Sequence, residues 1–149
     1  GALLPFFRDA GQDLRRVTGV DLSAGMLRYA LERFPEAEMI QGDILTFADP
    51  QGRRYDRAVF NACFGNLLDQ VAVLKHVSET LLAPGGLIVI SHPLGSKWLL
   101  GLQAQDPRMV VRPLPSEAEL RAWADGLPGL RVVSVEDEAD YYCAVLQQE

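Results

Sequence analysis

Two aspartates, each just after a short strand-like run, are the residues whose type and spacing could bind a ligand. Asp21 follows the run at 17–20, and Asp43 follows the run at 37–40. In a sheet of parallel strands, ligands bind at the carboxyl ends of the strands. A carboxylate there can accept hydrogen bonds from the two vicinal hydroxyls of a ribose, which predicts a nucleoside-containing ligand at Asp21. The alternatives are that Asp21 caps the helix that follows and that Asp43 is an ordinary turn residue after Gly42.

The elements that must position these residues alternate between strand and helix along the chain. Apolar residues at helical spacing, N-cap residues and Pro or Gly stops define the helices, and short apolar runs define the strands. The last two strands are separated only by an acidic turn at 136–140, so we expect them to pair antiparallel. The pattern predicts an α/β fold with a doubly wound, mostly parallel sheet and a C-terminal antiparallel strand pair. Helices are expected at 2–10, 23–34, 67–82 and 116–124, with a helical turn at 98–100, and strands at 17–21, 37–40, 57–61, 87–90, 130–135 and 141–146.

Composition limits the classes of partner. The chain has 149 residues, which suits one domain, and its net charge of −6 argues against a nucleic-acid backbone as partner. No apolar run approaches the roughly 20 residues of a membrane helix, so no membrane partner is expected. We expect the two cysteines, Cys63 and Cys143, to be buried reduced thiols in a reducing compartment, which predicts a cytoplasmic location without excluding an organelle. Two cysteines and two distant histidines predict no metal site.

Five segments, in order along the chain, resemble the motifs of one family. They are VDLSAGML at 20–27, QGDI at 41–44, YDRAVFN at 55–61, LAPGGL at 82–87 and YYCAVL at 141–146. These are similar to the second-strand motif, the adenine-contact motif, the fourth strand, the turn before the fifth strand and the terminal hairpin of class I S-adenosylmethionine-dependent methyltransferases. The resemblance implies a Rossmann-like fold, S-adenosyl-L-methionine as cofactor and a small-molecule methyl acceptor.

The resemblance also implies roles for individual residues. Asp21 would accept from the ribose hydroxyls, Asp43 would accept from the adenine amine, and the Ile44 N–H would donate to the adenine ring. Met26 could flank the adenine, although core packing explains its helical face equally well. The cofactor-binding residues expected on this basis are Gly1, Asp21, Leu22, Met26, Asp43, Ile44, Asn61 and Ala62.

The acceptor is expected to contact residues that follow the fourth and fifth strands of the family, here Phe64, His92 and Trp98. His92 could act as a general base toward an acceptor hydroxyl, although a lone histidine before a proline is more often structural. Phe64 is expected to be a wall or lid, or else part of the core. Trp98 and its apolar neighbours suggest a partly apolar acceptor.

The chain departs from the family pattern at its start. The first strand and most of its glycine-rich loop are missing, and Gly1 resembles the last glycine of that loop. Residues 1–149 are therefore expected to be a single incomplete domain that binds cofactor weakly or not at all, has impaired methyl transfer, and could self-associate through exposed strand edges. Two other interpretations stay open, namely a nicotinamide-dependent oxidoreductase, which Asp21 would serve equally well, and a non-catalytic remnant of a methyltransferase.

Overall fold

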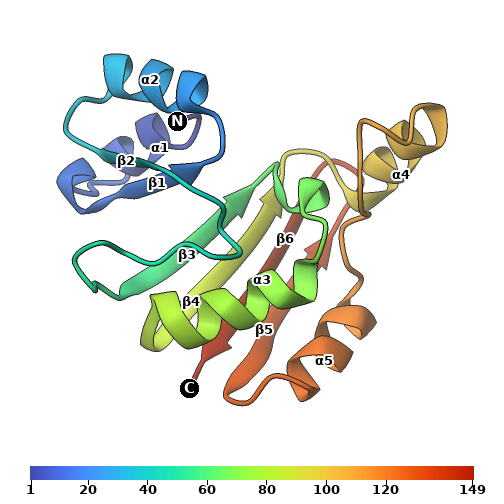
Figure 1. The fold of residues 1–149 in the computed structure, drawn as a ribbon. Coiled ribbons are helices and arrows are strands. Elements are labelled where there is room, and N and C mark those ends of the chain that lie inside the picture. Colours follow the sequence, from blue (N-terminus) through green and yellow to red (C-terminus); the bar gives the residue numbers. More distant parts are fainter. The chain divides into compact units, whose positions relative to one another are not determined.

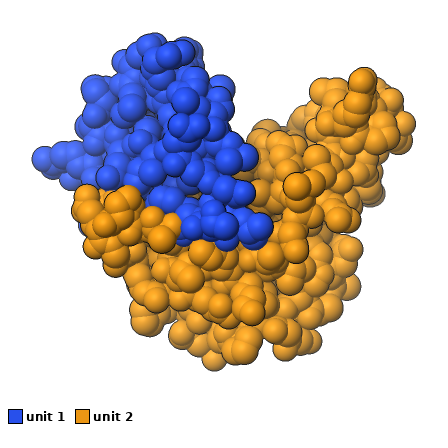
Figure 2. Space-filling view, viewed as in Figure 1, with its two compact units in different colours: residues 1–47 blue, residues 48–149 orange.

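The computed structural model describes residues 1–149, which form two compact units. Unit 1 comprises residues 1–47 and unit 2 comprises residues 48–149 (Figure 2). Each unit is described by itself.

Unit 1 is built on two parallel strands, in which Thr18 pairs with Glu38 and Asp21 pairs with Gln41. Its second helix begins as expected, because the Ser23 side chain accepts a hydrogen bond from the Met26 N–H at the N-cap. A buried apolar cluster holds the unit together: Leu4, Leu14, Phe34 and Ala37. The elements are α1 (Leu4–Asp9), η1 (Leu14–Arg16), β1 (Thr18–Asp21), α2 (Ala24–Arg33) and β2 (Glu38–Gln41).

Unit 2 is built on a four-stranded sheet in the order β3-β4-β6-β5. The pair β3–β4 is parallel, while β6 is antiparallel to both β4 and β5 (Figure 1). In this register His92, Tyr142 and Asp137 form one cross-strand row at the end of the sheet where β3 and β4 finish. The elements are β3 (Tyr55–Asn61), η2 (Phe64–Asn66), α3 (Gln70–His76), η3 (Val77–Leu81), β4 (Leu82–His92), α4 (Ser96–Gln105), α5 (Glu117–Asp125), β5 (Leu130–Asp137) and β6 (Tyr142–Gln148).

Helices of unit 2 bury their apolar faces against this sheet. The most deeply buried side chains come from α3, η3, α5 and the two central strands: Leu74, Val77, Leu120, Ile88, Ile90, Ala144 and Leu146. The unbroken apolar run at 87–90 in β4 is typical of a strand covered on both faces. The capping box expected at Ser116 and Glu119 is present and starts α5. None of the helices is both long and apolar enough to cross a bilayer.

The expected α/β class, with its parallel strands and C-terminal antiparallel pair, is confirmed. Three details differ from the sequence-based expectation. The helix expected at 67–82 begins only at Gln70 and continues as one π-helical turn from Val77. The expected helical turn near Trp98 is a ten-residue helix, α4. The expected burial of both thiols is wrong for Cys63, which is exposed because it lies in the loop after β3 rather than within the sheet, and Cys143 in β6 is only half-buried.

Candidate functional site

The two aspartates expected to bind a nucleoside lie at the same edge of unit 1. Asp21 is the last residue of β1, and Asp43 follows the end of β2 by two residues. Because β1 and β2 are parallel and in register, both carboxylates lie at the carboxyl end of this strand pair. This is the arrangement that binding one ligand with both side chains requires.

The Asp21 carboxylate has one oxygen engaged in the local turn. Its Oδ1 accepts a hydrogen bond from the Ser23 N–H at 2.8 Å, so the side chain fixes the turn into α2. The cap of that helix is Ser23 and not Asp21. Oδ2 is not used by this turn, and the side chain is exposed. Asp21 therefore combines a turn role with an oxygen that a ligand can reach.

Asp43 is held in the same way. Its Oδ1 accepts from the Leu45 N–H at 2.9 Å, and its backbone carbonyl accepts from the Thr46 N–H at 3.0 Å. These bonds use neither Asp43 Oδ2 nor the Ile44 N–H, the pair expected to contact an adenine. Gly42 precedes this turn, and a Cβ there would lie 3.6 Å from the Phe47 ring.

Two apolar residues that follow Asp21 in the sequence have exposed side chains. Leu22 is 69% exposed and Met26 is 54% exposed, so neither is accounted for by core packing. Single exposed apolar side chains are common on protein surfaces, so their exposure leaves Leu22 and Met26 available to a ligand without identifying one. Gly1 lies against α2, where a Cβ would lie 3.0 Å from the Ala30 Cβ.

In unit 2, the exit of β3 has a strained backbone. Ala62 has a φ of +54°, and its N–H donates to the Ser91 carbonyl at 2.8 Å. Asn61, the last residue of β3, accepts from the Ser91 hydroxyl through Oδ1 at 2.9 Å. Left-handed backbone at a non-glycine residue is unfavourable and concentrates at functional sites. Ser91, near the end of the neighbouring strand β4, therefore holds the expected cofactor residues Asn61 and Ala62 in a defined conformation.

Phe64, by contrast, belongs to the core of unit 2. Its side chain is 1% exposed, and its ring packs edge-on against Phe60 with centroids 5.5 Å apart. The structure therefore favours the packing role for Phe64 over contact with an acceptor. Sequence could not decide this point, because an aromatic residue after a strand suits either role.

His92 lies at the end of β4 and is fixed through its Nδ1 atom. Nδ1 lies 2.7 Å from the Leu94 carbonyl oxygen and 3.1 Å from the Leu94 N atom. Nδ1 donates to the Leu94 carbonyl in the tautomer that carries its proton there, which leaves the lone pair of the neutral ring on Nε2, and it accepts from the Leu94 N–H in the other tautomer. The ring stacks on Trp98 with centroids 6.1 Å apart and an interplanar angle of 28°. Two of the residues expected to meet the acceptor are therefore brought together.

Several residues near this edge were not identified from the sequence. The Asp137 carboxylate accepts hydrogen bonds from Ser96, and the buried Gln70 amide donates to the Pro113 carbonyl at 3.1 Å. The Tyr142 hydroxyl donates to the Pro115 carbonyl at 2.6 Å, and burial of this side chain raises its pKa. All of these contacts join residues more than 25 positions apart, so no local sequence motif predicts them.

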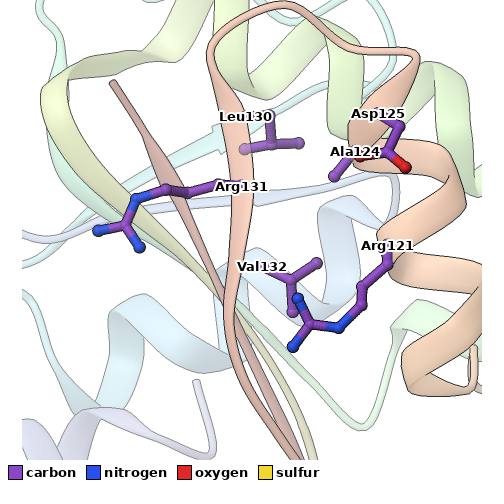
Figure 3. Close-up of a pocket in the computed structure, with 6 residues that line it drawn as sticks. All are labelled: Arg121, Ala124, Asp125, Leu130, Arg131 and Val132. Atoms are coloured by element: carbon purple, nitrogen blue, oxygen red, sulfur yellow. The ribbon is translucent and has the colours of Figure 1, made fainter.

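A depression of about 220 Å³ lies elsewhere in unit 2, between α5 and β5. Arg121, Asp125 and Arg131 line it together with apolar side chains (Figure 3). It is formed by the start of β5. Because β5 runs parallel to β4, and His92 is the last residue of β4, the depression lies at the opposite end of the strands from His92. Arg121 already pairs with Glu117 at 2.7 Å. This depression is therefore separate from the site at the strand ends.

The parallel strands, the helices that cover them and the C-terminal antiparallel pair define a Rossmann-like fold. Residues 1–135 match the model of a family described as "Methyltransferase domain". The chain belongs to this methyltransferase family, which confirms the resemblance drawn from its five motifs and gives no support to the oxidoreductase alternative.

Individual relatives agree with this family. The chain is 38% identical over 78 residues to the trans-aconitate 2-methyltransferase of Paracidovorax citrulli, which covers 52% of this chain and 30% of that protein. It is 40% identical over 80 residues to the enzyme of the same name from Rhodopseudomonas palustris BisB18, covering 52% and 29%. The matches thus span less than a third of the length of these relatives.

Solved structures share the fold. An S-adenosylmethionine-dependent methyltransferase from Mesorhizobium loti has a TM-score of 0.70 at 16% identity, covering 97% of this chain and 84% of that one. An O-methyltransferase of neocarzinostatin biosynthesis, solved with S-adenosylmethionine and a naphthoic acid, has a TM-score of 0.68 at 21% identity, covering 89% and 41%. At these identities the likeness concerns the fold.

Proposed function

We propose that this protein binds S-adenosyl-L-methionine and transfers its methyl group to a small-molecule acceptor. The observation that carries the proposal is the placement of Asp21 and Asp43 at one edge of a parallel strand pair, each with a carboxylate oxygen that its own turn does not use. The family match supports the cofactor, and the relatives named for trans-aconitate support an acceptor of small size.

The residues of unit 1 fit the adenosine part of this cofactor. Asp21 would accept hydrogen bonds from the ribose hydroxyls, and Asp43 would accept from the adenine amine. The Ile44 N–H would donate to the adenine ring, while the exposed side chains of Leu22 and Met26 would contact its faces. The cofactor, when bound, supplies a methyl group on a positively charged sulfur.

The residues of unit 2 would act on the acceptor. His92 would present Nε2, whose lone pair can take a proton from an acceptor hydroxyl while Leu94 holds Nδ1. Trp98, stacked on the same ring, would cover the acceptor and exclude water. Methyl transfer needs alignment of the acceptor and exclusion of water more than it needs further catalytic groups.

Calorimetric titration tests the cofactor, and a radiolabel assay tests the transfer. We expect S-adenosylhomocysteine to bind the full chain, NADH to leave it unchanged, and methyl label to pass from S-adenosylmethionine to at least one compound in a panel of small acids, phenols and amines that includes trans-aconitate. Binding of NADH with no response to S-adenosylhomocysteine would refute the proposal.

We further propose that the protein self-associates through strand edges. β1 pairs only with β2, and β3 pairs only with β4, so each offers one edge to another strand. Sedimentation velocity of the purified chain should show a concentration-dependent dimer. Strictly monomeric behaviour up to millimolar protein would contradict this part of the proposal.

A further inference from the structure

The N-terminus of helix α4 is capped by Asp137, the last residue of strand β5. The residue before the helix, Gly95, has no side chain to cap it. Instead, the Asp137 carboxylate accepts from the Ser96 N–H at 2.9 Å and from the Ser96 hydroxyl at 2.5 Å. The first N–H groups of a helix need such acceptors, and a negative charge there is favourable. Asp137 thus joins the start of α4 to the end of β5.

The backbone makes the same junction. A Cβ built on Gly95 would lie 1.9 Å from the Glu138 carbonyl oxygen and 3.4 Å from Asp137 Oδ1. No side chain fits there, so glycine is required for the loop before α4 to reach the end of β5. Two independent features, a carboxylate and a glycine, therefore fix this end of the helix at the same place.

The other end of this segment is tied to the loop after β3. The Gln103 side chain donates to the Val110 carbonyl at 3.0 Å, and the Arg112 N–H donates to the Gly65 carbonyl at 2.9 Å. Between these ties α4 buries little of itself, since Leu99 is its one buried residue. A ten-residue helix is marginally stable alone. Its position therefore depends on its polar anchors.

The anchors place α4 at the end of the sheet toward which the arrows of β3 and β4 point (Figure 1). Asp137 and His92 flank Tyr142 in one cross-strand row, and α4 carries Trp98 onto the His92 ring. We infer that Asp137 is a positioning residue, which holds α4 across this edge so that Trp98 stays against His92 on the side where the acceptor binds. This inference rests on the proposed methyl transfer only for the identity of that ligand.

Three measurements on the full chain test the positioning without any ligand. In a Trp123→Phe background Trp98 is the sole tryptophan, and its 47% exposure leaves room for about a twofold rise in acrylamide quenching. In a His76→Gln background His92 is the sole histidine, and its ring proton resonance reports stacking on Trp98. We expect Asp137→Asn to raise the quenching, to move the His92 resonance in the direction that Trp98→Leu moves it, and to speed amide exchange in residues 96–105.

Glu138→Gln is the matched control, because it removes a neighbouring exposed carboxylate and should change none of the three signals. Gly95→Ala should reproduce the Asp137→Asn result through the backbone clash. Asp137 is exposed, so the global unfolding temperature of Asp137→Asn should stay close to that of the parent. If Asp137→Asn leaves all three signals unchanged, or if Glu138→Gln alters them equally, Asp137 does not position α4, and the proposed methyl transfer stands independently of that result.

Discussion

Replacing Asp21 by asparagine separates the ligand role of this residue from its turn role. Asparagine keeps an Oδ1 atom that can accept the Ser23 N–H, which the wild-type side chain binds at 2.8 Å, so the turn into α2 should persist. The other oxygen becomes an NH₂ group, which cannot accept from a ribose hydroxyl. A hydrogen bond to a charged group contributes about 1.5–3 kcal/mol. Loss of one such bond should weaken binding about 10- to 150-fold.

Isothermal titration with S-adenosylhomocysteine measures this change, with the unfolding temperature as a check on the fold. Ser23→Ala is the matched control, because it removes the N-cap bond to the Met26 N–H and should lower the free energy of unfolding by about 1 kcal/mol without changing affinity. If Asp21→Asn binds as tightly as the parent, or if Ser23→Ala weakens binding equally, Asp21 acts only in the turn and the reasoning fails.

Three further predictions concern stability. The hydrogen bond from the Arg53 side chain lowers the pKa of the Asp49 carboxyl. Asp49 therefore stabilises the fold above about pH 4, where a free aspartate is ionised, and this contribution is lost as the pH falls below that range. Asp49→Asn should make the free energy of unfolding depend less on pH in the acid range, as measured by circular dichroism. Tyr142→Phe leaves the Pro115 carbonyl without its 2.6 Å donor and should lower the free energy of unfolding by about 1–2 kcal/mol in urea. Ser116→Ala should lower it by about 1 kcal/mol through loss of the capping box, measured the same way.

The sequence predicted those parts of the fold that local signals determine. The cap at Ser23 and the box at Ser116 were predicted because the side chains that satisfy the helix ends lie within three residues of them. The length of α4 was underestimated for the opposite reason. Its apolar residues follow no clear helical period, and its N-terminus is satisfied by Asp137, which lies 41 positions away from Ser96.

In the candidate site, too, local signals could be predicted from the sequence, whereas contacts between distant residues could not. Asp21 and Asp43 could be placed because a strand end is recognisable from the residues around it, and parallel pairing brings strand ends together. The contact between His92 and Trp98 could not be predicted, since the fold of the intervening loop sets it. The buried position of Phe64 likewise follows from the packing of η2 against β3 rather than from its neighbours in sequence.

A turn bond alone does not distinguish Asp21 and Asp43 from other aspartates of this chain. Asp13, Asp49 and Asp106 each accept a hydrogen bond from the N–H two residues later, as Asp21 and Asp43 do. In those three, however, an arginine two or four residues later also binds the carboxylate, with Nη2 at 2.7–2.9 Å from the second oxygen. Asp21 and Asp43 have no arginine at either spacing. In Asp13, Asp49 and Asp106 a neighbouring arginine therefore binds the second carboxylate oxygen. At Asp21 and Asp43 the local turn uses only Oδ1, so Oδ2 is available to a ligand.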